Sequence, residues 1–323
     1  MSNPNIPSRH SLLWLQAAAC GGDSMSLLNL ENPDLLEVLR DNRIDLVWHP
    51  SLSRQRPSQL QVTVKELVEG SRPLRLLCIE GAIANGPEGT GLADCLFGRP
   101  KREVIAELCA VADFVLAIGT CAAFGGVPAA PPNPMDVSGL QWLQAKQGGL
   151  LPAEWHSRRG LPVINIAGCP AHPLTIIQTI IALIDQGDSL ALDPFNRPLE
   201  CYNTMVHQGC TRNEYHEYDV EETDFGGRGC LFFNLGCQGP NTVGTCNSVL
   251  WNNQKSKTRA GVPCFGCTSP LFPATKDLFT TNKIGEIPIE LPNGVSRPNY
   301  MAYKGLAKAA TPQRLKDRAT AIS

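Results

Sequence analysis

The sequence predicts an α/β fold with two domains, residues 1–192 and 193–323. In the first domain, apolar strand-like runs alternate with segments of helical periodicity, which is typical of a parallel sheet covered by helices. From about Asp193 the periodicity fades, Gly, Pro and Asn become frequent, and cysteines occur in clusters. A domain of that composition buries little apolar surface and usually needs covalent or metal cross-links to be stable.

The elements of the first domain follow one another in a regular alternation. Five apolar runs are predicted to be buried strands: residues 11–16, 43–49, 75–80, 113–119 and 162–168. Three segments have helical spacing: residues 57–70, 100–112 and 172–187. In an open α/β sheet, ligands bind outside the carboxyl ends of the strands. Cys20, Cys121 and Cys169 all follow such ends, so a common site is geometrically natural.

Charge and hydropathy exclude several classes of function. A formal charge of -2 and a pI near 6.3 give no basic surface for nucleic acid. The N-terminus has neither the apolar core of a signal peptide nor a twin-arginine pair. The longest apolar run, residues 174–184, is shorter than the ~18 residues that a transmembrane helix needs. We therefore expect a soluble, cytoplasmic protein without a membrane anchor.

Thirteen cysteines are unexpected in a chain without an export signal. Because disulfides are rare in a reducing compartment, and because the count is odd, metal sites or catalytic thiols explain the cysteines better. Seven candidate ligands lie in the second domain: His207, Cys210, Cys230, Cys237, Cys246, Cys264 and Cys267. They could hold structural zinc, but one His and six Cys leave one of two tetrahedral sites short.

The same seven residues divide well into a four-ligand set and a three-thiolate set. The first set is His207, Cys210, Cys230 and Cys237; the second is Cys246, Cys264 and Cys267. Three thiolates without a fourth ligand suit a three-iron cluster, and soft thiolates suit iron–sulfur clusters at least as well as zinc.

Seven motifs occur in an order that resembles the small subunit of NiFe hydrogenases. They are WLQAAAC, IEGAI, IGTCAAFGG, AGCPAHP, HQGC, LGCQGP and VPCFGC. The resemblance runs from about Leu12 to Pro270, and the ending GVSRPNYMAYKGLAKAATP is similar to soluble uptake members of that family. It implies a flavodoxin-like parallel sheet in residues 1–192 that carries a proximal cluster, and an iron–sulfur domain in residues 193–323 that carries the medial and distal clusters.

The resemblance also implies a ligand set for each cluster. The proximal 4Fe–4S cluster is assigned to Cys20, Asp23, Cys121 and Cys169. The medial 3Fe–4S cluster is assigned to Cys246, Cys264 and Cys267, with a 4Fe–4S cluster as the alternative. The distal 4Fe–4S cluster is assigned to His207, Cys210, Cys230 and Cys237.

Several positions depart from the family pattern. Asp23 stands where the family has a fourth proximal cysteine, which resembles the actinobacterial-type, high-affinity branch. The spacing from Cys230 to Cys237 is one residue longer than the commonest spacing. Ser256 lies nearest the medial position that often holds Pro or Cys. Gly22 and Gly126 lie nearest the extra cysteines of oxygen-tolerant membrane relatives, so that six-cysteine cluster is not expected.

Some residues have a structural interpretation beside the functional one. Asp23 alone would be read as the N-cap of a helix beginning at Ser24. Glu80 either caps backbone amides or lies on a proton path near the proximal cluster. His49, His156 and His172 are interpreted as structural. Cys78 and Cys109 are predicted to be buried small apolar residues, while Cys95 and Cys201 receive no role.

The function implied is that of an electron-transfer subunit in a heterodimeric hydrogenase for hydrogen uptake. Hydrogen would be split at a Ni–Fe centre in a partner large subunit, and electrons would pass through three clusters to an external acceptor. The chain has no paired nickel-binding motif, so it would be inactive alone. A higher oligomer of heterodimers is expected. The alternatives are a hydrogen-sensing regulatory subunit and a zinc-stapled interaction protein.

Overall fold

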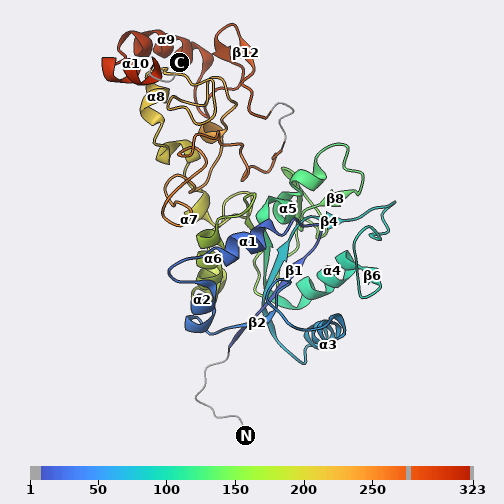
Figure 1. The fold of residues 1–323 in the computed structure, drawn as a ribbon. Helices are drawn as coiled ribbons and strands as arrows, with labels where there is room; N and C mark the ends of the chain where they lie inside the picture. Colours follow the sequence, from blue (N-terminus) through green and yellow to red (C-terminus); the bar gives the residue numbers. More distant parts are fainter. Residues whose placement is uncertain (1–8, 274–277, 321–323) are drawn as a thin grey trace. The chain divides into compact units, whose positions relative to one another are not determined.

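The computed structural model describes residues 9–273 and 278–320 (Figure 1). The chain divides into two compact units. One comprises Met1–Glu200 with Pro270–Phe272, and the other comprises Cys201–Ser269 with Pro273–Ser323. The sequence places its domain boundary between residues 192 and 193, and the structural division falls after Glu200.

The first unit is built on a five-stranded parallel sheet. Its strands are β1 (His10–Gln16), β2 (Ile44–Trp48), β3 (Leu74–Glu80), β7 (Ala112–Ile118) and β11 (Ile164–Ile166). They lie in the order β11-β7-β3-β1-β2, and all four neighbouring pairs are parallel. This is the flavodoxin-like order 2-1-3-4-5 when the five strands are renumbered along the chain. The predicted parallel α/β fold is therefore confirmed.

Helices cover the sheet in the alternation that the sequence predicts. They are α1 (Gly22–Leu28), α2 (Leu35–Asp41), α3 (Pro57–Val68), α4 (Lys101–Val111), α5 (Gly119–Phe124) and α6 (Pro173–Asp185). The segments predicted to be helical correspond to α3, α4 and α6. In Figure 1, α3 and α4 lie on one side of the strands, and α1, α2 and α6 lie on the other. The apolar face of α6 buries Ile176 and Ile180 against Trp14 and Phe114 of the sheet.

Short elements complete this unit. They are β4 (Ile83–Ala84), β5 (Cys95–Leu96), β6 (Arg99–Pro100), β8 (Val137–Ser138), β9 (Trp142–Leu143), β10 (Lys146–Gln147), and the 3-10 helices η1 (Val127–Ala129) and η2 (Gly187–Ser189). The last predicted strand is shorter than expected, with three residues in β11. Its flanks bond outside the sheet, since Val163 N donates to Gln141 Oε1 (2.9 Å) and Gly168 N donates to Thr120 Oγ1 (2.9 Å).

The strand order places a switch point between β1 and β3. The chain leaves these two central strands in opposite lateral directions, which opens a crevice at their carboxyl ends. Two hydrogen bonds join the segments that leave this edge, from Ala17 N to Glu80 O (2.8 Å) and from Ala18 N to Ala82 O (3.0 Å). The loop after β1 is therefore held beside the loop after β3.

The second unit consists mainly of loops. Its elements are η3 (Val206–Gly209), α8 (Asn213–Glu217), η4 (Gly239–Asn241), β12 (Lys283–Ile284), β13 (Ile287–Pro288), α9 (Arg297–Ala309) and α10 (Gln313–Thr320), and α7 (Leu199–Tyr202) crosses the division. Its apolar cluster contains Val206, Cys230, Leu231, Phe232, Phe233, Cys237 and Cys264. Three of these seven residues are cysteines, so thiol side chains form a large part of this apolar cluster. Within the residues that the structure describes, no helix has the length and hydropathy to cross a membrane.

Candidate iron–sulfur sites

The structure brings the four predicted proximal ligands to the carboxyl edge of the sheet. Cys20 follows β1, Asp23 lies in α1, Cys121 lies in α5, and Cys169 follows β11. Burial raises the pKa of Cys121 to about 12. The charges of Cys169, Asp23 and Cys20 raise this pKa further, as expected for groups that lie within electrostatic range of Cys121.

Two hydrogen bonds fix the spacing between the Cys121 and Cys169 segments. Thr120 N donates to Gly168 O (2.9 Å), and Gly168 N donates to Thr120 Oγ1 (2.9 Å). Each bonded residue directly precedes one of the cysteines. The two segments that carry these cysteines are therefore adjacent in the fold although they are far apart in the sequence.

Asp23 does not cap its helix. The helix begins at Gly22, its N-cap is Gly21, and no side chain of the N-cap residue bonds to it, so the interpretation of Asp23 as the cap of a helix beginning at Ser24 is wrong. Asp23 is 8% exposed, and its Oδ1 accepts a hydrogen bond from Ala171 N (2.6 Å). Burial raises the pKa of Asp23 to about 7, against the effect of this hydrogen bond. The carboxylate is directed across the site, away from its own helix.

Glu80, at the end of β3, supplies the missing cap. Its Oε1 accepts hydrogen bonds from the backbone amides of Asp23 (3.1 Å) and Ser24 (3.2 Å). Its Oε2 accepts from Ser24 Oγ, Trp14 Nε1 and Gln16 Nε2. A carboxylate at a helix N-terminus is favourable because the first amides have no intrahelical partner. Glu80 is 1% exposed and makes the capping contacts of the structural interpretation.

Three glycines leave room around the proximal ligands. A Cβ built on Gly119 would overlap Asp23 Oδ2, and Gly119 has a φ of +81°. A Cβ on Gly126 would lie 2.9 Å from Cys121 Sγ, and one on Gly22 would lie 3.1 Å from Cys20 Sγ. At three of the four proposed ligands, Asp23, Cys121 and Cys20, the backbone therefore comes so close that a Cβ atom would crowd the ligand. Three thiols and a buried carboxylate in such a cradle fit a thiolate-bound iron–sulfur cluster.

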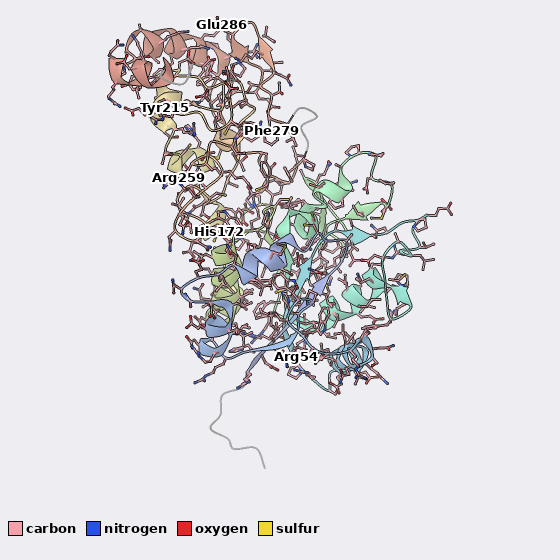
Figure 2. The ribbon with its side chains drawn as sticks, in the orientation of Figure 1. Arg54, His172, Tyr215, Arg259, Phe279 and Glu286 are labelled. Carbon is pink, nitrogen blue, oxygen red and sulfur yellow. The ribbon has the colours of Figure 1, made fainter. Side chains whose placement is uncertain are left out.

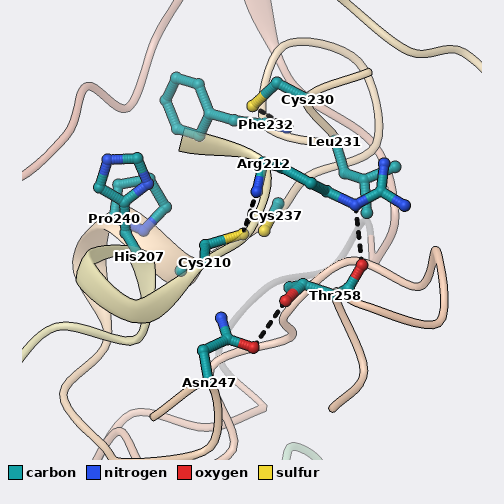
Figure 3. A pocket seen from close by; sticks show the side chains of 11 residues that line it. His207, Cys210, Arg212, Cys230, Leu231, Phe232, Cys237, Pro240, Asn247 and Thr258 are labelled. Carbon is teal, nitrogen blue, oxygen red and sulfur yellow. Dashed lines mark hydrogen bonds between the residues drawn. The ribbon is translucent and has the colours of Figure 1, made fainter. Parts of the chain in front are cut away.

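A second site gathers the four predicted distal ligands of the second unit. His207, Cys210, Cys230 and Cys237 line one pocket (Figure 3), whose empty volume is about 330 Å³ when its opening is counted. Burial raises the pKa of Cys230 and of Cys237. A metal ion that coordinates such a buried thiol compensates the charge and allows the thiol to lose its proton.

Backbone amides point at all three thiols of this pocket. Arg212 N donates to Cys210 Sγ (3.4 Å), and Phe232 N donates to Cys230 Sγ (3.5 Å), as drawn in Figure 3. Cys264 N donates to Cys237 Sγ (3.3 Å). Amide donors favour the negatively charged form of an acceptor, so the pocket is prepared for thiolates.

The buried guanidinium of Arg212 lines the same pocket. Its Nε donates to Thr258 O (2.8 Å) and its Nη1 donates to Gly229 O (2.5 Å). No Asp or Glu forms an ion pair with it in the ranges that the structure describes. A buried cation without an acidic partner needs another counter-charge. A cluster held by three thiolates fits that requirement.

The three predicted medial ligands form a third group beside the second. Burial raises the pKa of Cys246 to about 11, and the charge of Cys267 adds to the rise. Cys264 interacts electrostatically with Cys246 and Cys267 and also with Cys237 of the distal set. Lys257 Nζ lies 4.0 Å from Cys267 Sγ and above the ring of Phe265. Three thiols and a lysine suit a negatively charged cluster.

The side chain of Ser256 is already hydrogen-bonded to other residues of the protein. It is 4% exposed, its hydroxyl donates to Asn247 Oδ1, and its Oγ accepts from Arg259 N (3.3 Å). Asn247 Oδ1 also accepts a hydrogen bond from Thr258 Oγ1 (2.8 Å), which Figure 3 draws, so Ser256 belongs to a larger polar network. This favours three thiolates, without Ser256, as the medial ligand set.

The sequence did not single out His216, which lies within the distal site. Its Nδ1 is 3.5 Å from Cys230 Sγ, and its ring meets that of His207 edge-to-face with centroids 4.7 Å apart. Burial and the neighbouring His207 lower the pKa of His216 to about 4. Its position in NEYHE, flanked by no other candidate ligand, gave no signal. Arg212 was missed for the same reason.

The remaining cysteines and histidines lie outside the three groups. Cys78 and Cys109 are fully buried, as predicted, whereas Cys201 is buried and Cys95 is exposed. His172, labelled in Figure 2, accepts a hydrogen bond from Leu174 N (3.3 Å) and thereby caps α6. His49 packs against Trp14. Across the described ranges, no three His, Cys, Asp or Glu side chains are placed to bind a single metal ion.

Both parts of the chain match known protein families. Residues 20–183 match the family described as NADH ubiquinone oxidoreductase, 20 Kd subunit, and residues 202–280 match the family of the C-terminal region of NiFe/NiFeSe hydrogenase small subunits. The periplasmic NiFe hydrogenase small subunit 1 of Nitratidesulfovibrio vulgaris is 30% identical over 283 residues, which cover 84% of this chain and 82% of that protein.

Solved structures show the same relationship. The actinobacterial-type NiFe-hydrogenase from Ralstonia eutropha superposes with a TM-score of 0.75 at 25% identity, covering 93% of this chain and 90% of that one. The NiFeSe-hydrogenase of Dm. baculatum superposes with a TM-score of 0.73 at 26% identity, covering 85% of this chain and 100% of that one. The chain therefore belongs to the family of NiFe hydrogenase small subunits.

Proposed function

We propose that this chain holds three iron–sulfur clusters and relays electrons from a Ni–Fe centre in a partner large subunit to an external acceptor. Hydrogenase small subunits carry iron–sulfur clusters and act with a large subunit in hydrogen oxidation, and the chain belongs to that family. Bound clusters would supply one-electron redox chemistry that amino-acid side chains do not offer. The observation that carries the proposal is the single pocket lined by His207, Cys210, Cys230 and Cys237.

For the proximal site we propose a 4Fe–4S cluster bound by Cys20, Asp23, Cys121 and Cys169. The Ala171 amide engages Oδ1 of Asp23, which leaves Oδ2 as the freer oxygen for iron. A carboxylate is a harder ligand than a thiolate, so it should change the potential and the lability of the cluster. Glu80 holds the helix that carries Asp23 in place.

For the second unit we propose a distal 4Fe–4S cluster on His207, Cys210, Cys230 and Cys237, and a medial 3Fe–4S cluster on Cys246, Cys264 and Cys267. A neutral imidazole in place of one thiolate makes the distal site less negative, which tends to raise its potential. This suits the station from which electrons leave the protein. The engaged hydroxyl of Ser256 supports three medial ligands.

The test is co-expression of the chain with its large subunit, followed by iron, sulfide and zinc analysis of the purified complex. The proposal predicts roughly eleven irons per chain and electron paramagnetic resonance (EPR) signals from three clusters at graded potentials. Zinc without sulfide would refute it and favour the zinc-stapled alternative. Sustained hydrogen oxidation with a redox dye separates an electron relay from a hydrogen sensor. Size measurements of the complex test the predicted oligomer of heterodimers.

A further inference from the structure

His216 lies between two predicted ligands of the distal cluster without belonging to the ligand set. It is carried by α8 (Asn213–Glu217), and its Nδ1 lies 3.5 Å from Cys230 Sγ. The imidazole rings of His216 and His207 pack face to edge, with an interplanar angle of 67°. The side chain therefore touches one thiol ligand and the one imidazole ligand of the site.

The orientation of the His216 ring is fixed by its neighbours. It stacks on Phe233, with ring centroids 5.3 Å apart and an interplanar angle of 19°. Phe232 packs edge-on against the ring at 5.4 Å. The backbone amide of His216 is also bonded, since it donates to Arg212 O (3.0 Å). A ring held on several sides keeps Nδ1 directed at the sulfur.

The chemistry of the sulfur decides the direction of this contact. A cysteine bound to iron is a thiolate, which has no proton to donate and can only accept. The nearby imidazole nitrogen must then carry the hydrogen. The Phe232 amide already donates to the same sulfur (3.5 Å), so His216 adds a side-chain donor to a backbone donor.

We propose that His216 donates a hydrogen bond from Nδ1 to the Cys230 thiolate and thereby raises the reduction potential of the distal cluster. The proposal rests on the proposed function, because it requires a cluster at this site. A donor draws electron density from the sulfur, and hydrogen bonds to the sulfurs are one of the factors that set the potentials of iron–sulfur clusters. His216 is thus a positioning and tuning residue, and not a ligand.

Two variants of the heterodimer separate the hydrogen bond from the packing. His216→Phe keeps a ring for Phe233 and removes the donor. His216→Asn removes the ring and keeps an amide N–H near the position of Nδ1. Redox titration monitored by EPR should show a lower distal potential in His216→Phe, with an equilibrium shift of about tenfold, or about 59 mV for one electron. His216→Asn should stay close to the wild type. His156→Phe, at an exposed site in the other unit, is the matched control and should change nothing.

The outcomes are distinguishable. Equal potentials in the wild type and His216→Phe, or equal shifts in both variants, would overturn the hydrogen bond. If a variant fails to assemble, the wild-type heterodimer can be tested by pulsed EPR of the distal cluster with histidine labelled by nitrogen-15. The spectrum should show a weakly coupled second imidazole and an exchangeable proton. Their absence would refute the inference. Absence of iron and sulfide from the complex would refute the proposed function instead.

Discussion

The backbone amide of Cys264 donates a hydrogen bond to the sulfur of Cys237 over 3.3 Å, which joins the predicted medial site to the predicted distal one. A second hydrogen bond joins the same two loops in the opposite direction, from Gln238 N to Cys264 O (2.6 Å). The two loops are therefore paired through their backbones. Loss of a ligand at one site should therefore alter the structure of the other site.

We predict that Cys264→Ala and Cys246→Ala both lose the medial cluster but differ in their effect on the distal one. Removal of the Cys264 ligand frees the segment whose amide bonds to Cys237, so the distal EPR signal should broaden or shift. Cys246 interacts with Cys267 and Lys257 of the medial site and serves as the control. Identical distal spectra in the two variants would contradict this coupling.

Gly119 should be sensitive to even the smallest side chain. Gly119→Ala would place a Cβ on top of Asp23 Oδ2 at a φ of +81°. Gly160 has the same φ with nothing within 4 Å of its Cβ position. Gly160→Ala should cost only the strain of this conformation, about 1–2 kcal/mol. Gly119→Ala should in addition lose roughly four irons, as measured by metal analysis. Equal iron contents in the two variants would argue against a ligand role for Asp23.

Glu80 can be tested for capping against proton transfer. Glu80→Ala leaves two backbone amides and three side-chain donors without their acceptor, each at a cost of about 1–3 kcal/mol when buried. We therefore expect a loss of stability and of proximal iron together. In Glu80→Gln, capping predicts that activity falls in step with proximal iron content. Low activity with full iron content would instead indicate a proton path.

Asp23→Cys restores the thiolate that the family pattern has at this position. We expect a four-iron proximal cluster with altered potential and altered EPR signals, because a thiolate is softer and more covalent with iron than a carboxylate. The Ala171 amide would lose its carboxylate acceptor, so a modest loss of stability should accompany the change. Spectra identical to the wild type would show that Asp23 does not bind the cluster.

Lys304 of α9 should stabilise the second unit in a pH-dependent way. Its Nζ lies 3.5 Å from Asp219 Oδ2 and 3.4 Å from Glu221 Oε1. Burial raises the pKa of Asp219, and Lys304 opposes this rise. Lys304→Met should therefore cost about 2 kcal/mol near neutral pH, because a buried carboxylate is left without its cation.

The sign of the pH effect follows from the pKa of Asp219. Without Lys304 this pKa rises further above its unfolded value, so the folded state binds the proton more tightly than the unfolded state. The penalty of Lys304→Met should be full above the folded pKa and should shrink as the pH falls through it. Denaturation of the complex at about pH 8 and about pH 5 measures the difference. In the double variant Lys304→Met/Asp219→Asn, most of the loss of stability caused by Lys304→Met at the higher pH should disappear.

The sheet, its main helices and the convergence of the proximal ligands could be predicted from the sequence. Apolar periodicity reports burial directly, and the ends of parallel strands share one edge. Capping of backbone amides was one of the two interpretations of Glu80, but the sequence could not indicate that the capped helix is α1, because the bonded amide of Asp23 is 57 residues away. His216 and Arg212 could not be identified as site residues from the sequence for a related reason. Their contacts depend on the path of loops without periodicity, and single polar residues there carry no pattern.

The turn at residues 169–172 performs several tasks at once. It presents the thiol of Cys169, bonds Asp23 through Ala171 N, accepts from Ser26 Oγ at Ala171 O (2.6 Å), and begins α6 with His172. Four consecutive residues thus join two helices and two candidate ligands. The length of this segment should therefore tolerate no change: a one-residue insertion or deletion would misalign all of these partners together, whereas a substitution would affect them one at a time.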